Sequence, residues 1–239
     1  MNSLIFEKWD KEKYDLFKET IKLSADEKYR EFHSSLVPDS SKIYGVRIPV
    51  LRNIAKEISK GNGISFLEFS KTDSYEERII QGFVISNLKL DYDKMLLYTD
   101  SFADKIDSWA VCDCVCASFK FIKKHKKEYF LHIQKFLNSK NPWHIRYGLV
   151  VLLDYYVDNE YIDEIFNIMD NIKNREYYVM MALAWLLSVC YAKFPKETYL
   201  YMKKSKIYDE AFNKGIQKIR ESSRVSKEDK EKILNLKRI

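Results

Sequence analysis

Residues 107–120 read Asp107-Ser-Trp-Ala-Val-Cys-Asp-Cys-Val-Cys-Ala-Ser-Phe-Lys120, and this stretch decides the fold class. Ser108 is a helix N-cap residue, and the carboxylate of Asp107 favours the positive end of a helix dipole. Apolar side chains then recur at spacings of three and four, as on a helix face buried in a core. This stripe consists of Val111, Cys112, Val115, Phe119 and Ile122. The pattern predicts a helix over residues 108–124.

A second face of the same predicted helix brings a carboxylate close to a large aromatic ring. Trp109 and Asp113 are four residues apart, so in a helix their side chains lie one above the other. The residues that continue this face are Cys116, Lys120 and Lys124. Two interpretations are open: the pair belongs to a functional site, or it is a half-buried aspartate and a rim tryptophan of a helical core.

Glycine and proline are scarce along the whole chain. The protein has 239 residues with only six Gly and four Pro, whereas a sheet-rich chain of this length needs more turn residues. Apolar residues make up 46% of the sequence, which is enough for a large core. We therefore expect an all-α protein that forms a single domain over residues 1–239.

The cysteines and the hydropathy of the chain indicate its cellular location and argue against a metal site. Three of the four cysteines alternate within one predicted helix, which is neither a disulfide framework nor a metal-ligand spacing. We expect reduced cysteines, no metal, no cofactor and a cytoplasmic location. No apolar run reaches transmembrane length and the N-terminus lacks a signal-peptide pattern, so no membrane association is expected. The cysteines are Cys112, Cys114, Cys116 and Cys190.

Helical patterns continue along the chain and repeat. Asp113, Arg146 and Met181 mark equivalent positions in three successive apolar helices, 33 and 35 residues apart. A period of roughly 35 residues built from helix pairs is typical of an α-solenoid of HEAT-like units. An irregular helical bundle is the alternative. The expected helices cover residues 4–23, 26–35, 49–59, 64–69, 74–88, 92–103, 108–124, 127–137, 143–157, 161–172, 177–191, 196–203, 208–222 and 226–236.

Stacked helix pairs curve into a superhelix, and the inner helices line its concave groove. If the three marked helices form the inner layer, Asp113 and Arg146 are neighbours across adjacent repeats. Trp185 then lies one helix further along. Two plainer interpretations stay open at this point: Trp185 is an ordinary core residue of an apolar helix, and Arg146 is a structural ion-pair partner of Asp113.

The charge balance permits a polyanionic partner. The formal net charge is +6, and basic residues cluster near the irregular segment that contains Arg47 and near the end of the helix predicted over 108–124. The second cluster is either a phosphate track or an ordinary solvated helix end. Its members are Lys120, Lys123, Lys124, Lys126 and Lys127.

Four stretches together resemble the AlkD-like family of DNA alkylation repair glycosylases. They are residues 44–52, 108–113, 141–147 and 177–186, within a likeness that runs from about residue 40 to residue 220. The combination of Ser-Trp-x-x-x-Asp, a later Trp-x-x-Arg and a further Trp is more specific than any single stretch. The resemblance implies a C-shaped stack of HEAT-like repeats with a concave DNA-binding groove. It also implies removal of cationic alkylated bases, such as 3-methyladenine and 7-methylguanine, from duplex DNA.

The resemblance also implies roles for individual residues. Asp113 matches the catalytic carboxylate, and Trp109 and Trp185 match the aromatics that flank the backbone of the lesion nucleotide. Arg146 matches the arginine of the same cleft. We add Arg47, Lys120 and Lys124 as candidate DNA contacts and expect the protein to act as a monomer.

Two rival functions remain from the sequence alone. Met181 and Ser188 stand where relatives carry basic residues, which suggests a DNA-binding module without catalysis. A protein-binding HEAT scaffold is the second rival, because solenoid grooves commonly hold peptides. A scaffold has no need for Trp109, Asp113 and Arg146 to converge, so their convergence in one groove discriminates between these functions.

Overall fold

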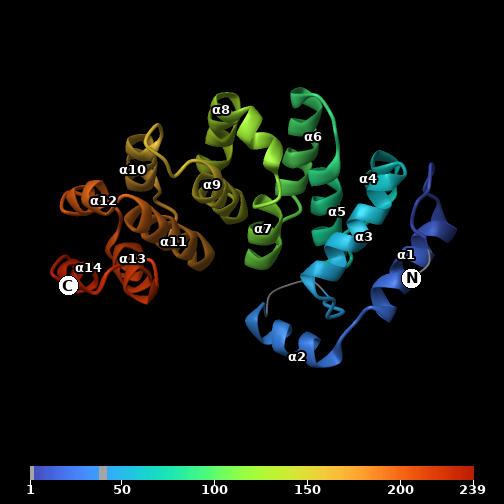
Figure 1. Cartoon of the computed structure of the whole chain (residues 1–239), viewed down its shortest axis with the longest axis horizontal. Coiled ribbons are helices and arrows are strands. Elements are labelled where there is room, and N and C mark those ends of the chain that lie inside the picture. Colours follow the sequence, from blue (N-terminus) through green and yellow to red (C-terminus); the bar gives the residue numbers. More distant parts are fainter. Residues whose placement is uncertain (1–2, 38–41) are drawn as a thin grey trace. The chain divides into compact units, whose positions relative to one another are not determined.

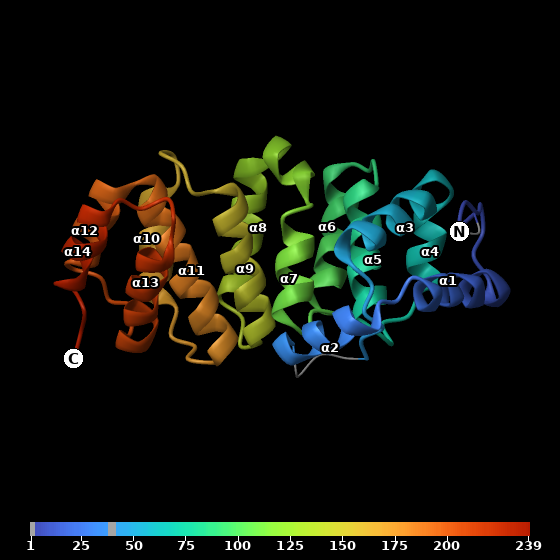
Figure 2. The ribbon, with the colours of Figure 1, turned by 60° about the horizontal axis from the view of Figure 1, so that its bottom comes forward.

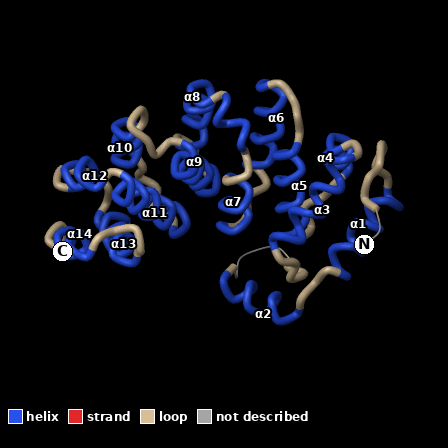
Figure 3. The backbone as a smooth tube through the Cα atoms, viewed as in Figure 1, coloured by secondary structure: helices blue, strands red, loops and turns tan. Residues whose placement is uncertain are grey.

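The computed structural model describes residues 3–37 and 42–239, and the named elements of that part of the chain are all helices joined by loops (Figures 1 and 3). The only β pairing in it is an isolated bridge between Lys42 and Ser74. None of its helices is long and apolar enough to cross a membrane. Its elements are α1 (Lys11–Leu23), α2 (Glu27–Leu36), α3 (Ile48–Lys60), α4 (Gly63–Phe69), α5 (Tyr75–Asn87), α6 (Tyr92–Ala103), α7 (Trp109–Cys116), the 3₁₀ segment η1 (Lys120–Lys124), α8 (Lys126–Leu137), α9 (Pro142–Tyr155), α10 (Ile162–Asn171), α11 (Tyr177–Lys193), α12 (Pro195–Met202), α13 (Asp209–Glu221) and α14 (Lys227–Leu234).

The helices group into two compact units, Met1–Phe121 (unit 1) and Ile122–Ile239 (unit 2). Within unit 1, α3 packs on α5 and α5 packs on α7. Within unit 2, α9 packs on α11 and α11 packs on α13, and Figure 2 shows the same succession of neighbours. This stacking of consecutive helices confirms the predicted all-α helical-repeat fold. The expectation of one domain over residues 1–239 stays a prediction.

The helices in the middle of each stack are apolar on several faces because they contact helices on more than one side. In unit 2, α11 touches α9, α12 and α13. Nine of its side chains are buried, including Ala182, Leu183 and Ala184, which point to different sides of the helix. In unit 1, α5 is buried along most of its length between α3, α6 and α7. A helix with neighbours on several sides has little surface in water, so its side chains can be apolar on more than one face.

Glycines allow the closest helix contacts. A Cβ built on Gly82 of α5 would lie 2.4 Å from Cγ1 of Val115 on α7. In unit 2, a Cβ on Gly215 of α13 would lie 2.6 Å from a methyl carbon of Leu187 on α11. These contacts are too short for any side chain, so glycine at each crossing sets how near the two helices approach.

The first helix begins later than the sequence predicts. We expected a helix over residues 4–23, but α1 starts at Lys11, after Asp10. The Asp10 side chain accepts a hydrogen bond from the backbone N–H of Lys13 and so caps the helix at this point. The residues before it include Leu4 and Trp9, which are buried without being helical. In the residues before Lys11, the apolar pattern therefore indicates burial but not a helix.

A buried carboxylate holds the loop before α3 in unit 1. Glu76 on α5 accepts hydrogen bonds from the backbone N–H groups of Tyr44, Gly45 and Val46, at 2.8–3.2 Å. Gly45 has a φ of 90°, which other residues rarely adopt. Burial raises the pKa of Glu76, and the three N–H donors oppose that shift. The loop that leads into α3 is therefore fixed to α5, the helix on which α7 packs.

Candidate functional site

The start of α7 agrees with the sequence analysis. Ser108 is the N-cap residue, and its side chain accepts a hydrogen bond from the backbone N–H of Val111 at 3.4 Å. Trp109 and Asp113 are both half-buried in α7. Because they are four residues apart in a helix, they lie on the same side of it. The structure therefore places a carboxylate beside an aromatic side chain at the edge of unit 1 and not in its interior.

A hydrogen bond from α7 to α2 orients the indole of Trp109. Its Nε1 donates to the backbone carbonyl oxygen of Leu36, the last residue of α2, at 3.1 Å. This bond satisfies one of the carbonyl groups that a helix leaves without an internal partner at its C-terminus. The orientation of Trp109 therefore depends on the position of α2.

The negative charge of Asp113 affects the pKa of the neighbouring Cys114 thiol. Burial raises the pKa of the Cys114 thiol to about 11, and the negative charge of Asp113 adds to that shift. The other two cysteines of α7, Cys112 and Cys116, are buried, and all are free thiols. Their burial confirms the prediction that they are small core residues.

The predicted helix over 108–124 is wrong beyond residue 116. α7 ends at Cys116, and Lys120–Lys124 form a separate 3₁₀ segment. The Ser118 hydroxyl donates to the carbonyl oxygen of Cys114 and accepts from Arg52, which favours a turn over another helical residue. Lys120 and Lys124 are exposed and lie in this 3₁₀ segment, outside α7.

Arg47 has partners within unit 1. Its guanidinium donates to the carboxylate of Asp26 at 2.8 Å and lies over the ring of Tyr29, 4.8 Å from the ring centre. This contact lowers the pKa of Asp26. Both members of the ion pair are exposed, so the pair is weak in water. The role of Arg47 as a DNA contact stays a prediction.

Arg146 is a buried cation on α9 in unit 2. Its side chain is 4% exposed, and one terminal nitrogen donates to the backbone carbonyl oxygen of Tyr178 at 2.7 Å. The ring of Tyr178 stacks on that of Trp143, with 4.9 Å between centres. The sequence analysis selected Arg146 and used Trp143 only as part of the Trp-x-x-Arg motif, without a role of its own. Tyr178 received no role, because it meets Trp143 only through the packing of α9 on α11.

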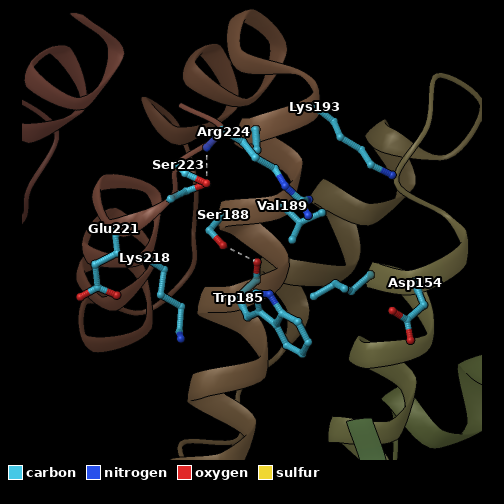
Figure 4. A pocket seen from close by; sticks show the side chains of 12 residues that line it. Asp154, Trp185, Ser188, Val189, Lys193, Lys218, Glu221, Ser223 and Arg224 are labelled. Carbon is cyan, nitrogen blue, oxygen red and sulfur yellow. Dashed lines mark hydrogen bonds between the residues drawn. The ribbon is translucent and has the colours of Figure 1, made fainter. Parts of the chain in front are cut away.

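Trp185 lines an open cavity of about 640 Å³ within unit 2 (Figure 4). It is half-buried, so it is not an ordinary core tryptophan. The hydroxyl of Ser188 donates to the carbonyl oxygen of Trp185 at 2.7 Å, so this side chain is used inside α11. The cavity lies between α9, α11 and the end of α13. Its charged lining residues, none of which the sequence analysis selected for a site, are Asp154, Lys193, Lys218, Glu221 and Arg224.

The candidate residues fall into two groups. Unit 1 contains Arg47, Trp109, Asp113 and Lys120, and unit 2 contains Lys124, Arg146 and Trp185. Trp109 and Asp113 share a helix face, and Arg146 and Trp185 lie on the neighbouring helices α9 and α11. Convergence of the two groups in one groove stays a prediction. No three His, Cys, Asp or Glu side chains gather as a metal site in residues 3–37 and 42–239.

Comparison with protein families shows to which family the whole chain belongs. The model of a family described as DNA alkylation repair enzyme matches residues 17–224. The chain belongs to this family. A DNA alkylation repair enzyme acts on DNA, so the partner is DNA and the biological role is DNA repair. A search of curated proteins found no match.

The family match includes every candidate residue. Residues 17–224 contain Trp109, Asp113, Arg146 and Trp185, and they end at Arg224 in the cavity beside Trp185. The DNA alkylation repair match extends over both units, so neither unit alone represents the family. It confirms the resemblance drawn from the four short stretches of sequence.

Proposed function

We propose that the protein is a DNA glycosylase of base excision repair, which hydrolyses the N-glycosidic bond of cationic alkylated purines in duplex DNA. Its substrates are bases of the 3-methyladenine and 7-methylguanine type. The observation that carries the proposal is the half-buried carboxylate of Asp113 beside Trp109 on α7, in a chain of the DNA alkylation repair family. This pair supplies an anion and an aromatic face, which a cationic lesion requires.

The reaction needs one carboxylate. An alkylated purine with a positive charge leaves as a neutral base and takes the electron pair of the bond between C1′ and nitrogen. The sugar becomes oxocarbenium-like, as in glycoside hydrolysis. Asp113 stabilises that positive charge, and it orients a water whose oxygen forms the new bond to C1′. The proton lost by the water passes to the carboxylate or to solvent, and an abasic site remains.

The other candidates position the substrate. Trp109 is held by the carbonyl oxygen of Leu36, so its ring packs against the sugar without reorganising first. Trp185 packs on the backbone from unit 2, where it lines an open cavity. Arg146 is held by the carbonyl oxygen of Tyr178, and its fork of N–H donors fits a phosphate.

Selectivity in this proposal comes from the charge of the lesion and not from its shape. The named side chains suit a sugar, a cation and a phosphate, whereas enzymes that read a flipped base need polar groups against its Watson–Crick edge. The base therefore stays outside any closed protein pocket. Cationic adducts are excised, and a neutral lesion such as uracil is not.

The test compares Asp113→Asn with the wild-type protein on duplexes that contain 7-methylguanine or uracil. Removing one electrostatic stabiliser costs roughly 10²–10³ in rate, so single-turnover excision of 7-methylguanine falls by about that factor. Asp163→Asn on α10 is the matched control, because Asp163 is exposed and lies in the other unit. Uracil is released by none of the three proteins.

Three outcomes contradict the proposal in different ways. Equal excision rates for Asp113→Asn and wild type place the chemistry on another residue. Binding of methylated duplex without any release of base by the wild type identifies a non-catalytic DNA-binding module. Absence of DNA binding favours the protein-binding scaffold.

A further inference from the structure

The cavity beside Trp185 has the composition of an anion site. Three cationic side chains line it from two different elements, Lys193 at the end of α11 and Lys218 and Arg224 in and after the last turn of α13. Hydroxyl groups stand among them and can donate hydrogen bonds to an anion. These are the side chains of Ser222 and Ser223. The hydroxyl of Ser188 already donates to the carbonyl oxygen of Trp185.

The lining carries three cationic and two acidic side chains, so the cations are in excess by one. In Figure 4 the carboxylate of Glu221 turns away from Trp185, whereas Lys218 extends toward it. Glu221 accepts a hydrogen bond from the side chain of Gln217 at 2.7 Å, on the outer face of α13. Asp154 reaches the cavity from α9, across from Lys218 and Arg224. The end of the cavity near α13 is therefore cationic.

Arg224 is the cation best placed for a ligand. Its backbone N–H is bound to the hydroxyl of Ser222 at 3.2 Å, which fixes the loop after α13. Lys193, by contrast, already donates from Nζ to the carbonyl oxygen of Val157 at 3.2 Å. A guanidinium presents paired N–H donors that match two phosphate oxygens, which an ammonium group does not. Arg224 and Trp185 thus line the same cavity, a combination that suits a phosphate and its neighbouring sugar.

We propose that this cavity binds a backbone phosphate of the lesion-containing DNA strand, with Arg224 and Lys218 as the phosphate-binding residues and Trp185 against the adjoining sugar. The inference rests on the proposed function, because it takes duplex DNA as the ligand. The cationic residues beside Trp185 then come from α13 and the loop that follows it. On α11 itself, the positions where relatives carry basic residues are occupied by Met181 and Ser188. Arg224 and Lys218 set the position of the strand and take no part in bond cleavage.

The test uses the whole chain and a matched control. Arg224→Gln is compared with Arg220→Gln, since Arg220 is an exposed arginine in the last turn of α13 that does not line the cavity. Both changes remove one positive charge. Binding to a duplex with one 7-methylguanine is measured across a salt series. Arg224→Gln is expected to lower affinity several-fold and to reduce the slope of log K against log salt by about one unit.

A second measurement locates the phosphate. Single uncharged methylphosphonate linkages are placed one after another along the lesion strand. Wild type and Arg220→Gln lose affinity at one linkage beside the lesion, and Arg224→Gln no longer responds at that linkage. Inorganic phosphate, added at constant ionic strength, does not displace the duplex if the site serves backbone phosphates, whereas displacement identifies a site for free phosphate and overturns the proposal.

The outcomes separate this inference from the proposed function. If wild type excises the lesion but both arginine variants show the same slope and the same methylphosphonate pattern, the phosphate site is wrong and the glycosylase proposal stands. If wild type neither binds nor excises, both proposals are overturned.

Discussion

Asp113 and Cys114 are adjacent residues that illustrate how local charge controls reactivity. The thiol is largely buried and next to a carboxylate, and both features disfavour the thiolate. Its three fellow cysteines are fully buried in α7 and α11. Cys114 is therefore the one thiol whose titration reports on the charge of the proposed catalytic group.

We predict that Cys114 reacts slowly with iodoacetamide near neutral pH and that its rate rises only as the pH approaches about 11. Asp113→Asn removes the neighbouring negative charge, so the apparent pKa of the thiol falls in that variant. Peptide mass spectrometry after timed labelling at several pH values gives both rates. A native thiol that titrates near the ordinary cysteine pKa, or an Asp113→Asn variant with an unchanged profile, contradicts this.

At the scale of elements, helix crossings determine where the site residues lie. Gly82 brings α5 against Val115, which is two residues after Asp113 on α7. The same device occurs in unit 2, where Gly215 brings α13 against Leu187, two residues after Trp185. A glycine on the neighbouring helix thus allows the close packing of α7 and of α11, the two helices that carry the candidate residues.

The sign of the change in stability caused by Gly82→Ala tests this close packing. In an uncrowded helix, Gly→Ala stabilises a protein by about 1 kcal/mol. Gly82→Ala places a methyl group 2.4 Å from Val115, so we expect it to destabilise the protein by roughly 1–3 kcal/mol. Urea unfolding measures the change. A stabilised Gly82→Ala protein shows that α5 and α7 separate easily.

Helix positions were largely predictable from sequence, because periodicity and capping are local. The predicted helix over 92–103 matches α6, and Ser108 caps α7 as expected. The end of α7 was not predictable, since it depends on the hydroxyl of Ser118 bonding back to Cys114. The cavity residues Lys218 and Arg224 were missed for a different reason. They meet Trp185 only through the packing of α11 on α13, and no local spacing records that contact.

At the scale of the whole molecule, net charge and family membership point to the same partner. The chain carries a formal net charge of +6 and belongs to the DNA alkylation repair family. Neutralising phosphates with lysine and arginine releases counterions, and this release makes binding depend on salt.

We predict that affinity for duplex DNA falls linearly on a log–log plot against salt, for methylated and unmodified duplexes alike. The two lines have nearly equal slopes, because backbone contacts do not distinguish the bases. Fluorescence anisotropy titrations at several salt concentrations measure the slopes. An affinity that does not change with salt is incompatible with a backbone-binding surface and favours a partner other than nucleic acid.

The serial packing of α9, α11 and α13 has a consequence for how such a chain tolerates changes in length. Each of these helices rests on the one before it, while α10 and α12 lie to one side of the row in Figure 1. Insertions in the turns that flank α10 and α12 therefore leave the register of the row unchanged. Lengthening α11 by a single residue, by contrast, rotates Trp185 by about 100° away from the cavity, since a helix has roughly 3.6 residues per turn.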